Sequence, residues 1–221
     1  MDNDDFERKS DAEIWALLPN LESRDKCSAL RVLGSRAFDR EEFGRAASLA
    51  GEVASIAAEM DDVRLTAWSL ADQAIATCRD GDCNEAMDHF RQAVPWFERA
   101  GDDLGKARTL NSVAMCALNA RRREEALEAA TVSYDISAAE EDTHIAGMSA
   151  FHAGKASYLL DKEAQALQWL ARSREAFRAE GDVSRVAMVD DYAATVHDYL
   201  GNYEEAASLL RSCLHVAETT S

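Results

Sequence analysis

The chain has 221 residues, of which 47% are hydrophobic and 29% charged, a composition typical of a folded, soluble protein rather than a disordered one. Its 41 acidic side chains outnumber 24 Lys and Arg, and the formal charge of −17 repels phosphate groups. Nucleic acid and anionic membranes are therefore unfavourable partners. With only two prolines, little interrupts the backbone hydrogen bonds of long helices.

The sequence lacks the features of a membrane-spanning or secreted protein. Its longest uninterrupted apolar run, from Val113 to Leu118, is far shorter than the roughly 18–20 residues that span a bilayer. The acidic residues 1–5 do not show the basic and then apolar order of a secretion signal. Five cysteines, an odd number without a CxxC pair, are typical of free, buried thiols. We therefore expect a cytoplasmic protein.

Residues 1–23 form an acidic N-terminal segment that precedes the repeats described below. Ser10 and Glu13 have the spacing of a capping box, and the apolar residues that follow predict a short helix ending at Pro19. We expect this helix to cover the open end of the first repeat, because the end of a repeat array otherwise exposes an apolar face. Residues 1–9 are expected to lack fixed structure.

A 40-residue period runs through the rest of the chain. Alanine recurs five times at this spacing, and a second column of glycine or alanine stands 12 residues before it. The columns contain Ala46, Ala86, Ala126, Ala166 and Ala206, and Gly34, Ala74, Ala114, Gly154 and Ala194. A small residue on each of two helices lets them cross at close range. Each unit is therefore interpreted as two helices joined by a tight turn.

Turn and cap signals predict where these helices begin and end. Capping-box patterns, which satisfy free amides at a helix start, are found at Asp39 with Glu42, Asp82 with Glu85, and Asn202 with Glu205. Glycine followed by aspartate, at Gly101 and at Gly181, predicts the breaks between units.

The segment from Gly201 to Ala206, with the sequence Gly-Asn-Tyr-Glu-Glu-Ala, resembles the motif that opens the second helix of a tetratricopeptide repeat. Phe43 with Ala46 matches the same motif in part. The resemblance covers nearly the whole of residues 24–221 and implies an all-α fold, an α-solenoid of about five helix-turn-helix repeats. These are expected at about 24–60, 61–101, 102–141, 142–181 and 182–221, each longer than the usual ~34 residues.

The sequence offers no convergent set of catalytic residues. The five histidines lack the spacing of zinc ligands, and no nucleotide-binding glycine loop or nucleophile elbow occurs. We therefore expect no enzyme activity, no cofactor and no metal. The one basic run, Arg121 to Arg123, lies at a predicted turn. It has two interpretations, either favourable contact with a helix dipole or docking of an acidic segment or phosphate.

In the tetratricopeptide family, the first helix of each repeat lines a concave groove that binds peptides. Carried onto this chain, that resemblance gives a set of candidate ligand-binding residues. They are Arg31, Arg108, Asn111, Phe151, Lys155, Tyr158, Asp191 and Asp198. Basic residues in the first four repeats and acidic residues in the fifth could orient a ligand. The alternative, that much of this set packs between helices, stays open.

The leading hypothesis is a non-catalytic scaffold that binds a peptide or a segment of another protein in this groove. The alternative is a regulatory or sensor unit that responds to a small peptide or metabolite. Apolar residues in the last helix, among them Leu210 and Leu214, predict an interface with a second copy or with a partner. Outward-facing Arg211, His215 and Glu218 would instead make a sufficient polar cap.

Overall fold

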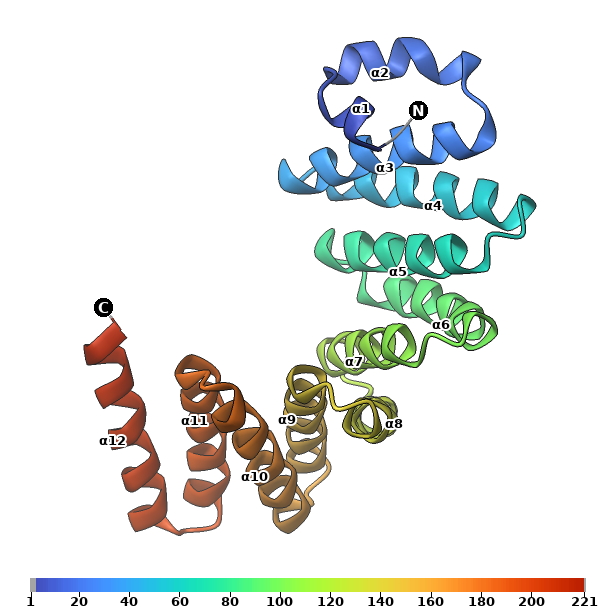
Figure 1. The fold of residues 1–221 in the computed structure, drawn as a ribbon. Coiled ribbons are helices and arrows are strands. Elements are labelled where there is room, and N and C mark those ends of the chain that lie inside the picture. Colours follow the sequence, from blue (N-terminus) through green and yellow to red (C-terminus); the bar gives the residue numbers. More distant parts are fainter. Residues whose placement is uncertain (1–2, 221) are drawn as a thin grey trace. The chain divides into compact units, whose positions relative to one another are not determined.

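The computed structural model describes residues 3–220, and the side chains of residues 5–214, as a succession of helices without strands (Figure 1). A short N-terminal group comprises α1 (Asn3–Glu7), α2 (Asp11–Leu17) and the 3₁₀ turn η1 (Leu18–Asn20). Ten longer helices follow: α3 (Ser23–Asp39), α4 (Phe43–Glu59), α5 (Val63–Arg79), α6 (Cys83–Ala100), α7 (Asp103–Asn119), α8 (Arg123–Ala139), α9 (Thr143–Leu159), α10 (Glu163–Glu180), α11 (Val183–Tyr199) and α12 (Tyr203–Thr220). The predicted all-α repeat fold is confirmed.

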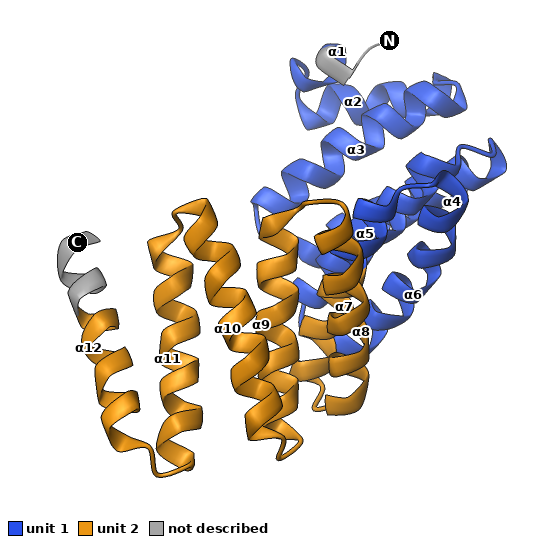
Figure 2. Cartoon of the chain, turned by 60° about the horizontal axis from the view of Figure 1, so that its bottom comes forward, with its two compact units in different colours: residues 1–109 blue, residues 110–221 orange. Residues whose placement is uncertain are grey.

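The chain divides into two compact units, residues 1–109 and residues 110–221 (Figure 2). In unit 1, each helix from α3 to α6 packs against the next, and α1 and α2 pack on α3. In unit 2, α8 to α12 pack in the same sequential manner, and α9 also contacts α11. The repeat boundaries given above remain a proposal. No helix in the described part of the chain is both long and apolar enough to cross a membrane.

One kind of turn ends the long helices, and it recurs every 20 residues. A residue in the left-handed conformation stands in each turn, at Glu41, Asp61, Gly81, Gly101, Arg121, Glu141, Asp161, Gly181 and Gly201. At the second of these turns the Asp62 amide donates to the Ala57 carbonyl at 2.9 Å, and the Asp61 amide donates to the Ala58 carbonyl at 3.1 Å. These two bonds form a Schellman motif, which satisfies carbonyls that the end of a helix leaves unpaired.

Aspartate often follows the left-handed residue and begins the next helix. Side-chain oxygens accept hydrogen bonds from helix amides at Asp62, Asp82, Asp102, Asp142 and Asp182. The predicted breaks at Gly101 and Gly181 are confirmed. The predicted capping box of Asp39 with Glu42 is wrong, because Asp39 is the last residue of α3 and Glu42, the N-cap of α4, makes no side-chain cap bond.

The alanine column that revealed the period is buried at helix crossings. Ala46, Ala86, Ala126, Ala166 and Ala206 are all at most 5% exposed. The glycine column behaves differently at its two glycines. A Cβ added to Gly154 would lie 2.9 Å from Leu170 Cγ and 3.3 Å from the Ala166 carbonyl oxygen, whereas one added to Gly34 would meet only Leu49 Cβ at 3.7 Å. The close crossing is therefore specific to α9 and α10.

Substituting alanine at these two glycines should have opposite effects. Gly154→Ala should lower the free energy of unfolding by about 1–2 kcal/mol, because overpacking outweighs the gain in helix propensity. Gly34→Ala should raise it by up to about 1 kcal/mol, because the site accepts a methyl group at ordinary contact distance. Urea unfolding followed by circular dichroism would measure both variants. Equal effects would contradict the difference in packing.

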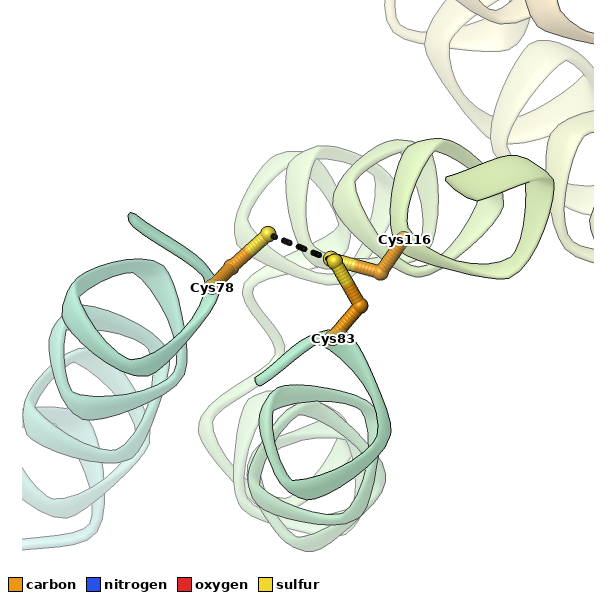
Figure 3. Close-up of side chains that lie close together, drawn as sticks. All are labelled: Cys78, Cys83 and Cys116. Atoms are coloured by element: carbon orange, nitrogen blue, oxygen red, sulfur yellow. Dashed lines mark hydrogen bonds between the residues drawn. The ribbon is translucent and has the colours of Figure 1, made fainter. Parts of the chain in front are cut away.

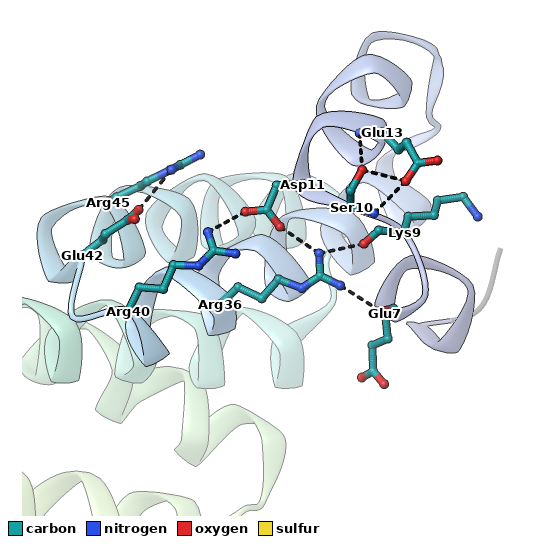
Figure 4. A network of polar contacts seen from close by, with 9 residues as sticks. All are labelled: Glu7, Lys9, Ser10, Asp11, Glu13, Arg36, Arg40, Glu42 and Arg45. Atoms are coloured by element: carbon teal, nitrogen blue, oxygen red, sulfur yellow. Dashed lines mark hydrogen bonds and ion pairs between the residues drawn. The ribbon is translucent and has the colours of Figure 1, made fainter.

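The N-terminal segment is held firmly against α3 (Figure 4). Phe6 is fully buried, and the Arg36 guanidinium donates to the Glu7 and Lys9 carbonyls and to Asp11 Oδ1, each at 2.8 Å. The expectation that residues 1–9 lack fixed structure is therefore wrong for residues 3–9. The capping box at Ser10 is confirmed with both of its bonds present. Because α3 supplies Arg36, the segment is attached through α3 itself.

Candidate functional site

Unit 1 contains a cavity of about 630 Å³ between the first helices of its helix pairs. Helices α3 and α5 form opposite walls, α4 contributes Ala46, Ala50 and Val53, and Glu7 of the N-terminal segment lies at the edge. Of the predicted binding residues, Arg31 lines this cavity. Ser69 and Asp72 of α5 also line it. The sequence analysis missed both, because the carried-over columns selected their neighbours Trp68 and Ala71.

Unit 2 carries an aromatic surface formed by four rings of α9 and α11. Phe151 and Tyr158 lie on α9, and Tyr192 and Tyr199 lie on α11. Ring centroids are 5.8 Å apart for Phe151 and Tyr192, 5.9 Å for Tyr158 and Tyr192, and 5.8 Å for Tyr158 and Tyr199, all in edge-to-face geometry. Such pairs hold one another in place. The rings pass from a buried Phe151, 7% exposed, to Tyr199, 63% exposed.

Lys155 lies on the aromatic surface. Its Nζ is 5.5 Å from the centre of the Phe151 ring and 5.6 Å from the centre of the Tyr192 ring. Within the described residues, no carboxylate forms an ion pair with this ammonium group. The three predicted residues Phe151, Lys155 and Tyr158 are therefore brought together. Tyr192 and Tyr199 were missed, because each stands one position after a selected aspartate.

A buried polar network lies in unit 2 next to the aromatic surface. The Asn111 Oδ1 atom is 2.9 Å from His152 Nδ1 and 3.3 Å from the Ser149 hydroxyl, which itself contacts Ser133 at 2.7 Å. An amide oxygen only accepts, so His152 must donate through Nδ1–H. Burial, assisted by the charge of Lys155, lowers the pKa of His152 to about 4. The side-chain oxygen of Asn111, a predicted ligand contact, is therefore used in packing.

This neutral, buried histidine should make stability depend on pH. In the unfolded chain His152 takes up a proton near pH 6.5, whereas in the folded chain it does so only near pH 4. The free energy of unfolding should therefore fall as the pH drops through this window, by about 1.4 kcal/mol per pH unit from this residue. Urea unfolding between pH 7 and pH 4 would measure the slope.

The variant His152→Gln should flatten this pH dependence, because glutamine does not titrate. His197→Gln, which changes a histidine outside the core, is the matched control and should keep the slope of the parent. A parent and a His152→Gln variant with parallel profiles would contradict the assignment.

The remaining predicted residues do not join these groups. Asp191 and Asp198 are exposed on α11 of unit 2, and Arg108 is exposed on α7 within unit 1. The side chains of Leu210 and Leu214 are 44% and 63% exposed on α12. In the basic run, Arg121 occupies the left-handed turn position and Arg123 donates to the Leu159 carbonyl at 2.8 Å. Arg123 therefore contacts the carboxyl end of α9, which agrees with the helix-dipole interpretation.

Two cysteines flank the turn between α5 and α6 (Figure 3). The sulfur atoms of Cys78 and Cys83 are 3.7 Å apart, and both residues are partly buried. Figure 3 also draws Cys116, which belongs to α7 in unit 2. All five cysteines are free thiols, as predicted, but only Cys27 and Cys116 are fully buried.

The comparisons with known proteins agree with this geometry. Residues 64–139 match the family model for the tetratricopeptide repeat. The chain is built of tetratricopeptide-like repeats. No curated protein sequence matches it significantly.

Several solved structures share the tetratricopeptide-like fold at low sequence identity. BtubC (BKLC) from P. vanneervenii has a TM-score of 0.81 at 16% identity, over 96% of this chain and 88% of its own. RapI in its apo form has a TM-score of 0.81 at 20% identity, over 90% of this chain and 55% of its own. A STAND protein with a tetratricopeptide repeat sensor, from Pyrococcus horikoshii, has a TM-score of 0.81 at 15% identity, over 94% of this chain and 32% of its own. These likenesses concern the fold.

Proposed function

We propose that the chain is a non-catalytic interaction module, and that the aromatic surface of unit 2 binds a segment of another protein. The observation that carries this proposal is Lys155, a cation held over two rings without a carboxylate partner among the described residues. On a chain with a charge of −17, an unpaired ammonium group next to exposed tyrosines is a local exception. It favours a segment that places an acidic side chain beside an apolar or aromatic one.

The described polar groups support binding rather than catalysis. His152 is neutral near pH 7, is buried, and donates to Asn111, so it is not poised to remove a proton from a ligand. Tetratricopeptide repeats serve in general as interaction scaffolds. A cytoplasmic location and the exclusion of nucleic acid stay predictions from the composition.

Peptides selected from a random display library on the intact protein should test the proposal. We expect enriched peptides to combine acidic with aromatic residues, and to lose at least about 1.5 kcal/mol of binding free energy in Lys155→Met when a charge-assisted contact is lost. Tyr158→Ala should also weaken binding, because it removes a ring that faces Tyr192 and Tyr199. Fluorescence anisotropy with a synthetic peptide would give the affinities.

Two variants outside the aromatic surface are matched controls, Lys162→Met for the charge and Tyr203→Ala for an exposed ring. Both should bind like the parent. Selected peptides that bind all four variants equally would place the binding site elsewhere on the chain.

A second candidate function, a sensor that responds to a small molecule, is favoured by the cavity of unit 1. Its volume of about 630 Å³ falls within the usual range of about 300–1,000 Å³ for small-molecule sites. The P. horikoshii structure, whose repeats are described as a sensor, shares the fold. Thermal stabilisation by a small molecule, in the absence of any protein partner, would distinguish this function from the first.

We further propose that the exposed leucines of α12 contact a second copy of the chain. Leu210 and Leu214 are four residues apart and therefore lie on one side of the helix. The double variant Leu210→Glu/Leu214→Glu should be monomeric in light scattering, whereas the parent should form dimers, because charged side chains oppose burial at an apolar contact. Monomeric parent protein at high concentration would contradict this interface.

A further inference from the structure

The cavity of unit 1 presents three polar groups that the protein itself leaves unpaired. Arg31 of α3 and the α5 residues Ser69 and Asp72 line it. Within the described residues, none of the three has a hydrogen bond or a direct ion pair. Polar side chains beside a cavity normally find protein or water partners, so an unpaired set points to a ligand.

Ser69 is the most informative of these groups because it is 97% buried, with 3% of its surface exposed. Its helix neighbours Thr66 and Thr77 both donate their hydroxyls to a carbonyl four residues earlier, at 2.9 Å. Ser69 makes no such bond, so its hydroxyl is available to a molecule in the cavity. Leaving a buried hydroxyl unpaired costs free energy that a bound ligand would recover.

The two charges lie on opposite walls and are not joined to each other by an ion pair in the described residues. They are close enough for Arg31 to lower the pKa of Asp72, but the apolar surroundings, which raise that pKa, have the larger effect although Asp72 keeps contact with solvent. Arg36, on the same helix as Arg31, is by contrast fully engaged with the N-terminal segment.

The remaining wall is apolar. Leu30, Val32, Phe38, Val53 and Ile75 surround the charged groups. A ligand that fits this arrangement carries one negative group, one positive group and an apolar side chain. Such a ligand has no net charge, so the overall charge of −17 does not repel it as it would repel a simple anion.

We propose that the unit 1 cavity binds a zwitterionic amino acid or dipeptide with an apolar side chain. Its carboxylate would contact Arg31, its ammonium group would contact Asp72, and the Ser69 hydroxyl would bond one of its polar atoms. This proposal rests on the second candidate function, because it names the class of molecule that a sensor would take. It is independent of the aromatic surface of unit 2.

Calorimetric titration of the intact protein with leucine and with leucyl-leucine tests the proposal and distinguishes the two sources of the zwitterion. At least one of the two should bind. N-acetyl-leucine, which lacks the ammonium group, and leucinamide, which lacks the carboxylate, should each bind at least about tenfold more weakly than the zwitterion. A capped form that binds as well as the zwitterion would overturn the proposal, as would the failure of both zwitterions to bind at millimolar concentration.

Variants assign the two ends of the ligand. Arg31→Gln and Asp72→Asn should each weaken binding of the zwitterion by at least about tenfold, because each removes one charge-assisted contact. Arg24→Gln and Asp61→Asn, which change exposed residues outside the cavity lining, are matched controls and should bind like the parent. Zwitterion affinity unchanged in Arg31→Gln and Asp72→Asn would overturn the assignment.

The outcome is separable from that of the proposed protein interaction. Lys155→Met should leave zwitterion binding unchanged, because Lys155 belongs to unit 2 and does not line this cavity. Loss of zwitterion binding in Lys155→Met, with the fold intact by circular dichroism, would contradict a site confined to unit 1.

Discussion

The left-handed turn that recurs every 20 residues is the constraint on which the rest of the structure depends. Two hydrogen bonds close each helix at this turn, and an aspartate that often follows begins the next. A fixed helix length makes the chain re-enter each helix in the same rotational phase. The same positions therefore face the interior in every pair, which is why the alanine column is buried throughout.

This regular phase also explains where ligand-accessible surfaces arise. First helices of neighbouring pairs lie side by side, as α9 and α11 do in unit 2, so equivalent positions meet across them. Where those positions carry large rings, the result is the aromatic surface. Where they are small residues with two isolated charges, as between α3 and α5, a cavity remains. One backbone plan therefore supports two chemically different surfaces.

Burial separates the polar residues of the chain into structural and available groups. The structural group includes Arg36, which fastens the N-terminal segment, and His152 with Asn111, whose bonds are satisfied inside unit 2. The available group includes Lys155 and Arg31, whose charges have no direct ion-pair partner among the described residues. Partners recognised by the available group are expected to supply the missing charge, because an unpaired charge beside apolar surface is unfavourable.

The sequence by itself determined the all-α repeat fold, because a 40-residue period of small residues requires close helix crossings wherever it recurs. It also placed Lys155, Phe151 and Tyr158 on one helix face. Only the tertiary structure decided which side chains are occupied, since Asn111 and Arg36 bind residues far away in sequence. Columns carried over from a family fix a face to within about one residue, and one residue of a helix is a rotation of about 100°. That rotation separates Ala71 from Asp72 and Asp191 from Tyr192, and contacts between helices alone settle it.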